Sequence, residues 1–517
     1  MHIVLVAAEN DALPRLKVGG LGDVIRDLPV ALNRMGHKVT VITPSYGLYS
    51  KDNAQPGATL EVNFMGVRET LQAFKVPTTL SATDVDQLVL EHKLFSIAGI
   101  GKIYTQDSSE GPFATDATRF ALFCAGVCEL LLSLGEKKVD VIHCHDWHTG
   151  AFLILRQFAA RYKALRDIPT VYSIHNLSMQ GVRPFRQLPS SLESWFPQLN
   201  YETDLIADPN YDDCVNLMRA GVNLASRVHT VSKTYAKEIL HPSNWSQGLV
   251  GGEGLEKDLQ QVHADGRLIG ILNGCDYDTP AAQKLTPGQL ATLVESTLDT
   301  WATAPGADFR NFYTALRRCS TLDSTSRDNG PILVSIGRLT TQKLFLLVQE
   351  HKGESVMSTL LKRLNGGFFI MLGSGDPYYE EFFTRTMMEH ENFLFLKGYS
   401  DTLSEALYSF GDLFIMPSIY EPCGISQMLA MRAGVPCLVH RVGGLNDTIT
   451  HGVNGFSFGG SSLAAKISEL ELCFTAVINC YLHKSDQFQK IATAAGNTHY
   501  TWEYAIAQYL QLLYVED

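Results

Sequence analysis

The chain has 517 residues, of which 45% are hydrophobic and 19% are charged, and this globular composition excludes a largely disordered protein. Its formal net charge is −12, with 42 Lys and Arg against 54 Asp and Glu. That acidic balance argues against non-specific binding to nucleic acid or to a membrane surface.

The opening residues, MHIVLVAAEN, contain one short apolar run. It is too short for a signal peptide or a membrane span, and it fits a buried strand. The ten cysteines are scattered and include no CxxC pair, which favours thiols packed in a core in a reducing compartment. We therefore expect a cytoplasmic protein that binds neither membranes nor nucleic acid.

Short apolar runs alternate with amphipathic stretches, which predicts an α/β fold with doubly wound parallel sheets. Residues 3–8 and 39–43 predict two strands joined by a helix over 24–35 that ends at Gly36. Further strands are predicted at 139–143, 170–174, 228–231 and 268–272. A second series of strands is predicted at 332–336, 368–372, 393–396, 413–416 and 437–439.

Residues 276–330, between the two series, are rich in Thr, Ala, Ser and Pro and have weak periodicity. We place the domain boundary at the start of this segment. The prediction is an N-terminal Rossmann-like domain over 1–275 and a C-terminal one over 276–490, with 276–330 as a variable hinge region.

Residues 17–23, KVGGLGD, lie between the first strand and the first helix. Their glycines allow close approach of a ligand to the backbone, and the N–H groups at a helix start favour an anion. A tight turn without ligand is the alternative, and a dinucleotide loop would follow its strand more directly. Glu9 stands at the carboxyl end of the same strand, where α/β proteins bind ligands.

Residues 143–148, HCHDWH, also follow a predicted strand. Three His and one Asp suggest a metal site, but neighbouring strand residues point to opposite faces, so His143 and Cys144 cannot line one cleft. A polar cluster that faces a sugar fits better. His175 and Asn176 again follow a strand, where a lone His is either functional or a structural residue.

Arg338 and Lys343 are predicted to lie in one loop after a strand of the second series, where two cations can neutralise a diphosphate. Solvated surface charges are the alternative. Tyr399, near another strand end, could stack on a base or simply be packed.

Residues 417–427, PSIYEPCGISQ, predict a turn before a helix. The N–H groups of Gly424, Ile425 and Ser426 are expected to be unpaired donors for a phosphate. Glu421 is too close to the same anion to bind it, so it is expected to accept hydrogen bonds from neutral hydroxyls.

In order along the chain, these motifs resemble the bacterial glycogen synthase and plant starch synthase family. Its opening signature, Lys-Thr/Val-Gly-Gly-Leu-Gly/Ala-Asp-Val, is matched by residues 17–24. The other matches are HDWH at 145–148, HN at 175–176, LNG at 272–274, RLT at 338–340, QK at 342–343, GSGDP at 373–377, GYS at 398–400, EPCG at 421–424 and GGL at 443–445.

The resemblance implies the GT-B fold, in which two Rossmann-like domains face a central cleft. It implies a retaining glucosyltransferase that moves glucose from ADP-glucose, or less probably UDP-glucose, to the non-reducing 4-OH of an α-1,4-glucan. No cofactor and no metal are implied. The residues 491–517 would form a C-terminal helix that packs back on the N-terminal domain. No pattern in the sequence indicates an oligomeric state.

The resemblance also implies roles for individual residues. The implied catalytic set is Arg338, Lys343, His175, Glu421 and Lys17. The implied donor-binding set is Lys17, Gly19, Gly20, Arg338, Lys343, Tyr399, Glu421, Cys423, Gly424, Ile425 and Ser426. On the sugar and acceptor side it implies Glu9, Asp23, Asp146, His175, Asn176 and Asn273.

Two departures from the family pattern leave alternatives open. Leu344 stands where the family usually has Gly and could reshape the loop after the cations, and residues 276–330 match poorly. A relative that glucosylates a small acceptor is therefore one rival hypothesis. A catalytically silent glucan-binding protein is another, against which the intact Lys17, His175, Arg338, Lys343 and Glu421 argue. A nicotinamide oxidoreductase does not explain Arg338 and Lys343.

Overall fold

β1 (His2–Val6) is the middle strand of a nine-stranded sheet, and all five of its residues are buried. The structure is a computed structural model that describes residues 1–78, 84–108, 111–134, 139–303, 308–323, 330–364 and 366–515. The strand order is β11–β10–β7–β6–β1–β2–β5–β4–β3. Neighbours pair in parallel from β11 to β5, whereas β4 and β3 add an antiparallel edge.

The predicted strands of this sheet are all present, but three strands were missed. The sheet contains β2 (Lys38–Pro44), β3 (Gln55–Phe64), β4 (Val67–Lys75), β5 (Val85–Glu91), β6 (Val141–His145), β7 (Thr170–Ile174), β10 (Arg227–Thr230) and β11 (Leu268–Gly270). The missed strands are β3, β4 and β5, whose mixed exposed and buried residues do not form continuous apolar runs. β6 begins and ends two residues later than predicted.

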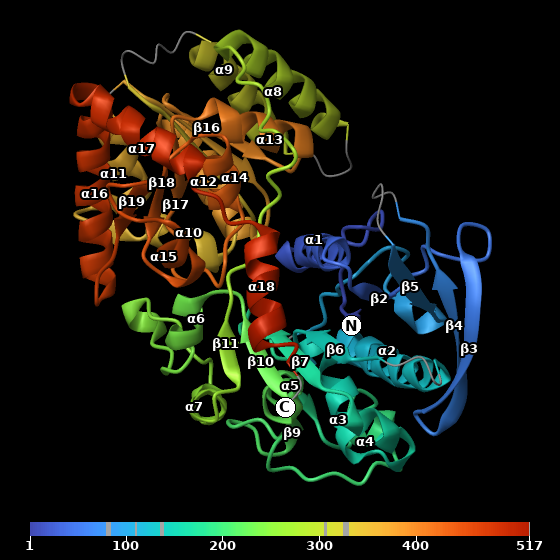
Figure 1. The fold of residues 1–517 in the computed structure, drawn as a ribbon. Helices are drawn as coiled ribbons and strands as arrows, with labels where there is room; N and C mark the ends of the chain where they lie inside the picture. The colour runs from blue at the N-terminus through green and yellow to red at the C-terminus, as the bar shows by residue number, and fades with distance from the viewer. Residues whose placement is uncertain are drawn as a thin grey trace. The chain divides into compact units, whose positions relative to one another are not determined.

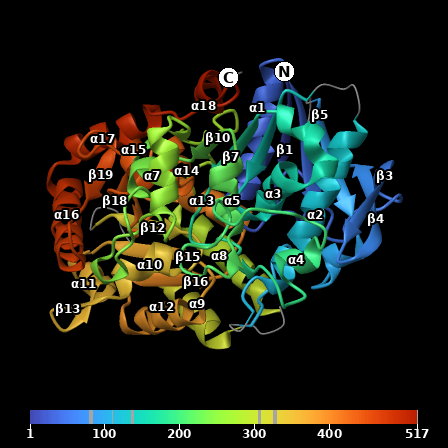
Figure 2. The ribbon, with the colours of Figure 1, turned by 90° about the horizontal axis from the view of Figure 1, so that it is seen from below.

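Helices cover both faces of this sheet. They are α1 (Gly20–Arg34), α2 (Ala114–Ser133), α3 (Gly150–Phe158), α4 (Leu192–Trp195), α5 (Leu217–Leu224), α6 (Lys233–Glu238), α7 (Glu256–Ala264) and α18 (Trp502–Leu512). Short 3₁₀ turns lie at Lys93–Ser96, Trp147–Thr149 and Ala160–Asp167, and β8 (Arg183–Pro184) pairs with β9 (Cys214–Val215). α18, from the end of the chain, packs beside α1 (Figures 1 and 2).

The second sheet has six parallel strands in the order β16–β15–β12–β17–β18–β19. They are β12 (Ile332–Ile336), β15 (Phe368–Gly373), β16 (Phe393–Lys397), β17 (Leu413–Met416), β18 (Cys437–His440) and β19 (Gly455–Phe458). The first five match the predicted runs closely, and β19 was not predicted. A separate hairpin joins β13 (Glu350–His351) to β14 (Glu354–Ser355).

Ten helices are described around the second sheet in the parts of residues 275–501 that the structure covers. They are α8 (Pro287–Ala302), α9 (Phe309–Asp323), α10 (Thr341–Val348), α11 (Val356–Arg363), α12 (Pro377–Glu389), α13 (Asp401–Phe410), α14 (Ser426–Arg432), α15 (Gly443–Thr448), α16 (Leu463–His483) and α17 (Ser485–Asn497). None of the described helices of the chain combines the length and apolar character needed to span a bilayer.

The weak periodicity that we saw in 276–330 was misleading, because this segment contains α8 and α9. Thr286 and Gln289 form a capping box at the start of α8. Its apolar residues Leu290, Val294 and Leu298 recur at helical spacing and join the core of the second sheet. The intervening Thr and Ser residues obscured this spacing in the sequence.

The chain divides into two compact units. Unit 1 comprises Met1–Ser243, Gly251–Gly274 and Trp502–Asp517, and unit 2 comprises Asn244–Val250 and Cys275–Thr501. The chain returns to unit 1 at Trp502, later than the expected position 491, because α17 packs Ile491 and Ala495 into the core of unit 2. Unit 2 also holds Asn244–Val250, which we had placed in the first domain.

Gly274 packs against Trp502, the first residue of α18, and leaves no room there for a side chain. A Cβ atom on Gly274 would lie 2.5 Å from Cγ and from the backbone N of Trp502. We expect Gly274→Ala to destabilise unit 1 by about 1–3 kcal/mol, because the Trp502 backbone must shift. Thermal and chemical unfolding measure this loss. Gly111→Ala, whose Cβ would lie 3.7 Å from Ala114 Cβ, is the control, and equal stability of the two variants would contradict the prediction.

Candidate functional site

Glu9 organises the glycine-rich loop of unit 1. Its Oε2 accepts hydrogen bonds from the backbone N–H groups of Val18, at 2.8 Å, and Gly19, at 2.7 Å. The hydroxyl of Tyr104 donates to Oε1 at 2.7 Å. Glu9 is only 3% exposed and its carboxylate holds the loop in place, whereas we expected it on the sugar side.

The same bonds correct the predicted role of Gly19. Its N–H is already paired with Glu9, so this group is not free to bind a phosphate. Gly20 begins α1, and a Cβ there would meet no heavy atom within 4 Å, which leaves open space beside the first turn. Gly20 is therefore a glycine of this loop that a ligand can approach closely.

Lys17 is held by two carboxylates. Its Nζ donates to Asp23 Oδ1 at 2.6 Å and to Asp11 Oδ2 at 3.2 Å. Arg26 pairs with the same two carboxylates, at 3.2 Å for Asp23. Asp23 thus positions cations in the structure, whereas we expected it on the sugar side.

Asp146, which follows β6, has a strained backbone. Its φ of 55° and ψ of −179° lie in a region that is normally restricted to glycine. The conformation turns its carboxylate back so that Oδ1 accepts the His175 N–H at 2.7 Å. Burial raises the pKa of Asp146 from 3.8 to about 7, against the lowering effect of the backbone N–H groups of His175 and Asn176. Asp146 therefore fixes the loop that carries His175.

His175 also bonds to a second histidine. Its Nε2 lies 3.0 Å from Nδ1 of His145, the last residue of β6. His175 is half-buried, whereas His145 and His143 are fully buried. Burial lowers the pKa of His175 to about 3, so its ring is neutral at physiological pH.

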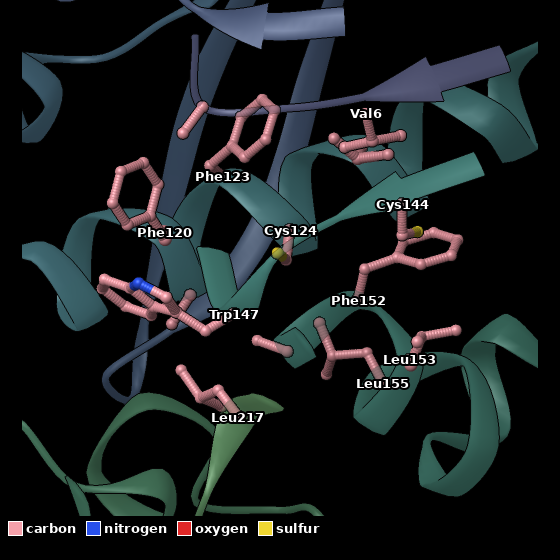
Figure 3. Packing of buried hydrophobic residues seen from close by; sticks show 14 of the residues in the cluster. Val6, Phe120, Phe123, Cys124, Cys144, Trp147, Phe152, Leu153, Leu155 and Leu217 are labelled. Carbon is pink, nitrogen blue, oxygen red and sulfur yellow. The ribbon is translucent and has the colours of Figure 1, made fainter. Parts of the chain in front are cut away.

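The expectation that residues 143–148 form a sugar-facing cluster is wrong for most of the motif. Trp147 and His148 are 3% and 6% exposed and pack around Phe120 of α2, with ring centroids 5.5 and 4.8 Å away. Figure 3 shows Trp147 among the apolar side chains of this core, near Phe120. Within this motif, the side chains of His145 and Asp146 form hydrogen bonds with His175.

Two asparagines complete the unit 1 site. Asn176 uses Oδ1 to accept the Ser178 N–H at 3.0 Å, which shapes its own turn. Asn273 is 3% exposed, and its Oδ1 has no hydrogen-bond donor among the described residues. An unpaired buried oxygen is costly, and the sugar-side role of Asn273 stays a prediction.

Glu421 is the centre of the unit 2 site. Its Oε2 accepts from Lys343 Nζ and from Ser418 Oγ, both at 3.0 Å, and Gln342 Nε2 lies 3.4 Å from Oε1. Glu421 is 6% exposed, so this ion pair is nearly buried. Lys343 lies in the first turn of α10 and not in a loop, and Leu344 packs into the core, which corrects the expectation that Leu344 reshapes a loop.

Arg338 is exposed, and no hydrogen bond or ion pair to a described residue holds its guanidinium. It lines a small hollow of about 20 Å³ together with Lys343 and Ser418. The two predicted cations thus border one concave site on unit 2. This arrangement suits an anion with more than one charge.

The Glu-Pro-Cys-Gly turn and the Gly443–Gly444 pair fit against each other. A Cβ on Gly443 would lie 1.9 Å from Glu421 O, and one on Gly444 2.0 Å from Cys423 O. Gly424 has a φ of +77°, which lets the chain turn into α14. Within the part of the chain that the structure describes, the N–H groups of residues 424, 425 and 426 donate to no backbone carbonyl.

Tyr399 is 61% exposed, and its hydroxyl donates to Asp401 Oδ1. Its ring is therefore open to solvent on unit 2. Stacking of Tyr399 on a base stays a prediction.

Residues 2–261 match the description "starch synthase catalytic domain", and residues 323–473 match "glycosyl transferases group 1". The glycogen synthase of Streptococcus gordonii is 32% identical over 99% of both chains. The chain belongs to the glycogen and starch synthase family. The glycogen synthase of Hydrogenobaculum sp. is 30% identical over 99% of this chain and 98% of its own.

Solved structures agree with this membership of the synthase family. The catalytic domain of starch synthase IV from Arabidopsis thaliana, solved bound to ADP and acarbose, has a TM-score of 0.74 and 28% identity, and covers 99% of this chain and 98% of its own. Sucrose-phosphate synthase from Thermosynechococcus elongatus, with a TM-score of 0.53 and 15% identity, shares the fold alone. This synthase-family chain is a glycosyltransferase with the two-domain GT-B fold.

Several residues of the synthase site were missed in the sequence. They are Asp11 and Arg26 around Lys17, Tyr104 on Glu9, His145 on His175, and Ser418 and Gln342 on Glu421. Ser418 and His145 were within quoted motifs, so their position was a usable signal. Tyr104 and Arg26 carried none, because nothing in their surroundings indicates contact with the strand ends.

The raised pKa of Asp146 predicts how this synthase responds to pH. A buried carboxyl with a pKa of about 7 binds its proton more tightly in the folded state, so stability falls as pH rises from about 4 to 7. Asp146→Asn keeps an Oδ1 acceptor and removes this cost. We expect it to be more stable than the wild type at pH 8, by up to about 4 kcal/mol, and equal to it at pH 4.

Chemical unfolding at pH 4, 6 and 8 measures this difference. Asp84→Asn, at an exposed position, is the control and should leave the pH dependence unchanged. An Asp146→Asn variant whose stability follows the wild-type pH curve would show that Asp146 is already ionised in the native protein at pH 4.

Proposed function

We propose that this chain is a retaining glucosyltransferase that transfers glucose from ADP-glucose to the non-reducing 4-OH of an α-1,4-glucan. The observation that carries the proposal is the pair of cations on unit 2, Arg338 and Lys343, beside the nearly buried carboxylate of Glu421. Family membership supports the reaction class. The solved relative that binds ADP and acarbose supports an adenine nucleotide and an α-glucan.

Arg338 and Lys343 are proposed to stabilise the negative charge that develops on the departing diphosphate. Lys343 is already oriented by Glu421, so little reorganisation is needed when the glucose–phosphate bond breaks. The free N–H groups of residues 424–426 are proposed to bind phosphate oxygens. This charge stabilisation by side chains and backbone needs no metal, and none is part of the proposal.

Glu421 is proposed to receive hydrogen bonds from glucose hydroxyls in addition to those from Lys343 and Ser418. An ionised carboxylate accepts about four hydrogen bonds, so capacity remains after these contacts. In unit 1, His175 and Asn273 are proposed to contact the sugar, while Lys17 and Gly20 stay predicted phosphate contacts.

A cytoplasmic location is also part of the proposal. None of the ten cysteines, all of which lie in described parts of the chain, forms a disulfide in the structure, and eight of them are buried. Free buried thiols fit a reducing compartment.

The first test is nucleotide release from ADP-glucose and from UDP-glucose, each with and without glycogen, followed by sizing of the glucan. We expect ADP release that depends on glycogen and yields longer chains. Release from UDP-glucose alone would show that UDP-glucose, and not ADP-glucose, is the donor. Release without glycogen would indicate a small acceptor, and no release from a folded sample would indicate a silent glucan-binding protein.

The second test removes the cations. We expect Arg338→Ala and Lys343→Ala each to lower kcat by about 100-fold or more, because a charge-stabilising donor is lost in the transition state. Arg338→Ala should keep the wild-type melting temperature, since Arg338 is exposed. Lys352→Ala is the matched control, because the Lys352 Nζ lies 3.6 Å from Glu471 Oε2 and its side chain is 69% exposed. Near-normal kcat in both variants would remove the proposed role.

A further inference from the structure

Unit 1 contains a cluster of buried polar side chains that the proposed reaction does not use. His143, Ser173 and His229, from three adjacent strands, are fully buried. Tyr509 of α18 and Tyr514 just after it reach this cluster from the end of the chain. His143 of this cluster stacks on His145, and His145 in turn bonds to His175.

The two histidines of the cluster are neutral. Burial lowers the pKa of His143 well below 6.5 and that of His229 to about 4. A neutral imidazole has one N–H donor and one acceptor nitrogen. Each hydrogen bond in the cluster therefore has a direction that its partners can determine.

One backbone carbonyl sets all these directions. His229 Nε2 lies 3.3 Å from Ile271 O, which can only accept, and 3.3 Å from the Tyr509 hydroxyl, which can accept or donate. A proton on Nε2 satisfies both contacts, whereas a bare Nε2 would set its lone pair against the Ile271 oxygen, so we place the His229 proton on Nε2. His229 Nδ1 then accepts from Ser173 Oγ, at 2.7 Å. Having donated its proton, Ser173 accepts from His143 Nε2, at 2.6 Å. His143 Nδ1 is left to accept the hydroxyl proton of Tyr514, at 2.8 Å.

His143 in turn supports His145 by stacking, with ring centroids 4.2 Å apart and planes at 26°. His145 Nε2 is buried and has no partner among the described residues. A proton there would leave a stranded N–H, which is rarer in proteins than an unpaired acceptor. The His145 proton therefore belongs on Nδ1, which donates to His175 Nε2 at 3.0 Å.

We propose that His145 is a positioning residue that fixes His175 as the Nδ1–H tautomer, and that the hydrogen-bond chain from Tyr514 to Ile271 holds His143 beneath this pair. His175 then offers a neutral N–H donor, which suits a sugar oxygen. The kinetic part of the inference rests on the proposed function of His175, whereas the tautomers do not depend on any substrate. Tyr514, near the end of the chain, thereby supports the His145–His175 pair through His143.

The tautomers can be measured on the full chain labelled with ¹⁵N-histidine. Long-range ¹H–¹⁵N correlation spectra separate Nδ1–H from Nε2–H rings, and single His variants assign the signals. We expect Nδ1–H for His145 and His175, and Nε2–H for His143 and His229. Any other assignment among these four rings would overturn the inference, whether or not the protein turns over ADP-glucose.

Kinetics separate positioning from a general structural role. We expect His145→Leu to lower kcat about tenfold, the worth of one hydrogen bond, with KM for the donor within about twofold. His145→Asn keeps an N–H near the position of Nδ1 and should restore most of kcat and the Nδ1–H signal of His175. His483→Leu, at an exposed position in unit 2, is the control. Wild-type kcat in a folded His145→Leu variant would overturn the positioning role.

Tyr514→Phe tests the far end of the chain. It removes only the hydroxyl that donates to His143 Nδ1. We expect the His143 ¹⁵N signals to shift and kcat to fall about threefold, less than for His145→Leu, because the effect reaches His175 only through stacking. Unchanged His143 signals in this variant would contradict the proposed chain of donors.

Discussion

A parallel sheet with helices on both faces leaves polar side chains one place to meet a ligand, the carboxyl ends of its strands. In β1 and β6 all residues are buried, so no side chain within these strands can reach a ligand in solvent. Glu9, Asp146 and His175 follow β1, β6 and β7, and Arg338 and Ser418 follow β12 and β17. The two units repeat this constraint, so each carries its own set of polar residues at one edge of its sheet.

The constraint also explains what the sequence could predict. Buried parallel strands are continuous apolar runs, so β7, β12 and β17 were placed with the right ends. Strands with a solvent face, such as β3 and β4, lack this signal and were missed. The helices α8 and α9 were missed because Thr and Ser separate their few apolar residues, and only packing against the second sheet makes that spacing informative.

For the site, the motifs were correctly predicted to follow strands, but the contacts that each side chain makes within the protein were not predicted. Glu9, Asp23 and Asp146 were expected to face a sugar, yet all three hold other parts of the protein. Residue type and spacing cannot distinguish these cases, because a carboxylate binds a backbone N–H and a sugar hydroxyl with the same atoms. Whether a carboxylate faces a backbone N–H or a ligand depends on the backbone conformation of the turn that carries it. Asp146 has a backbone conformation that no residue propensity favours.

Both units pair a lysine of the predicted site with a carboxylate. Lys17 is bonded to Asp23 and Asp11, and Lys343 to Glu421. A diphosphate at either ammonium would compete with the carboxylate that already pairs with it. The net attraction between ammonium and diphosphate is therefore weaker than for an unpaired lysine. The carboxylates also orient the ammonium groups, which in the proposed reaction lowers the cost of reorganisation when charge develops on the leaving group. Arg338, exposed and without a carboxylate partner among the described residues, lacks this constraint. In the proposed reaction its full charge is therefore available to the diphosphate, and unit 2 offers one cation held by Glu421 and one that no described residue holds.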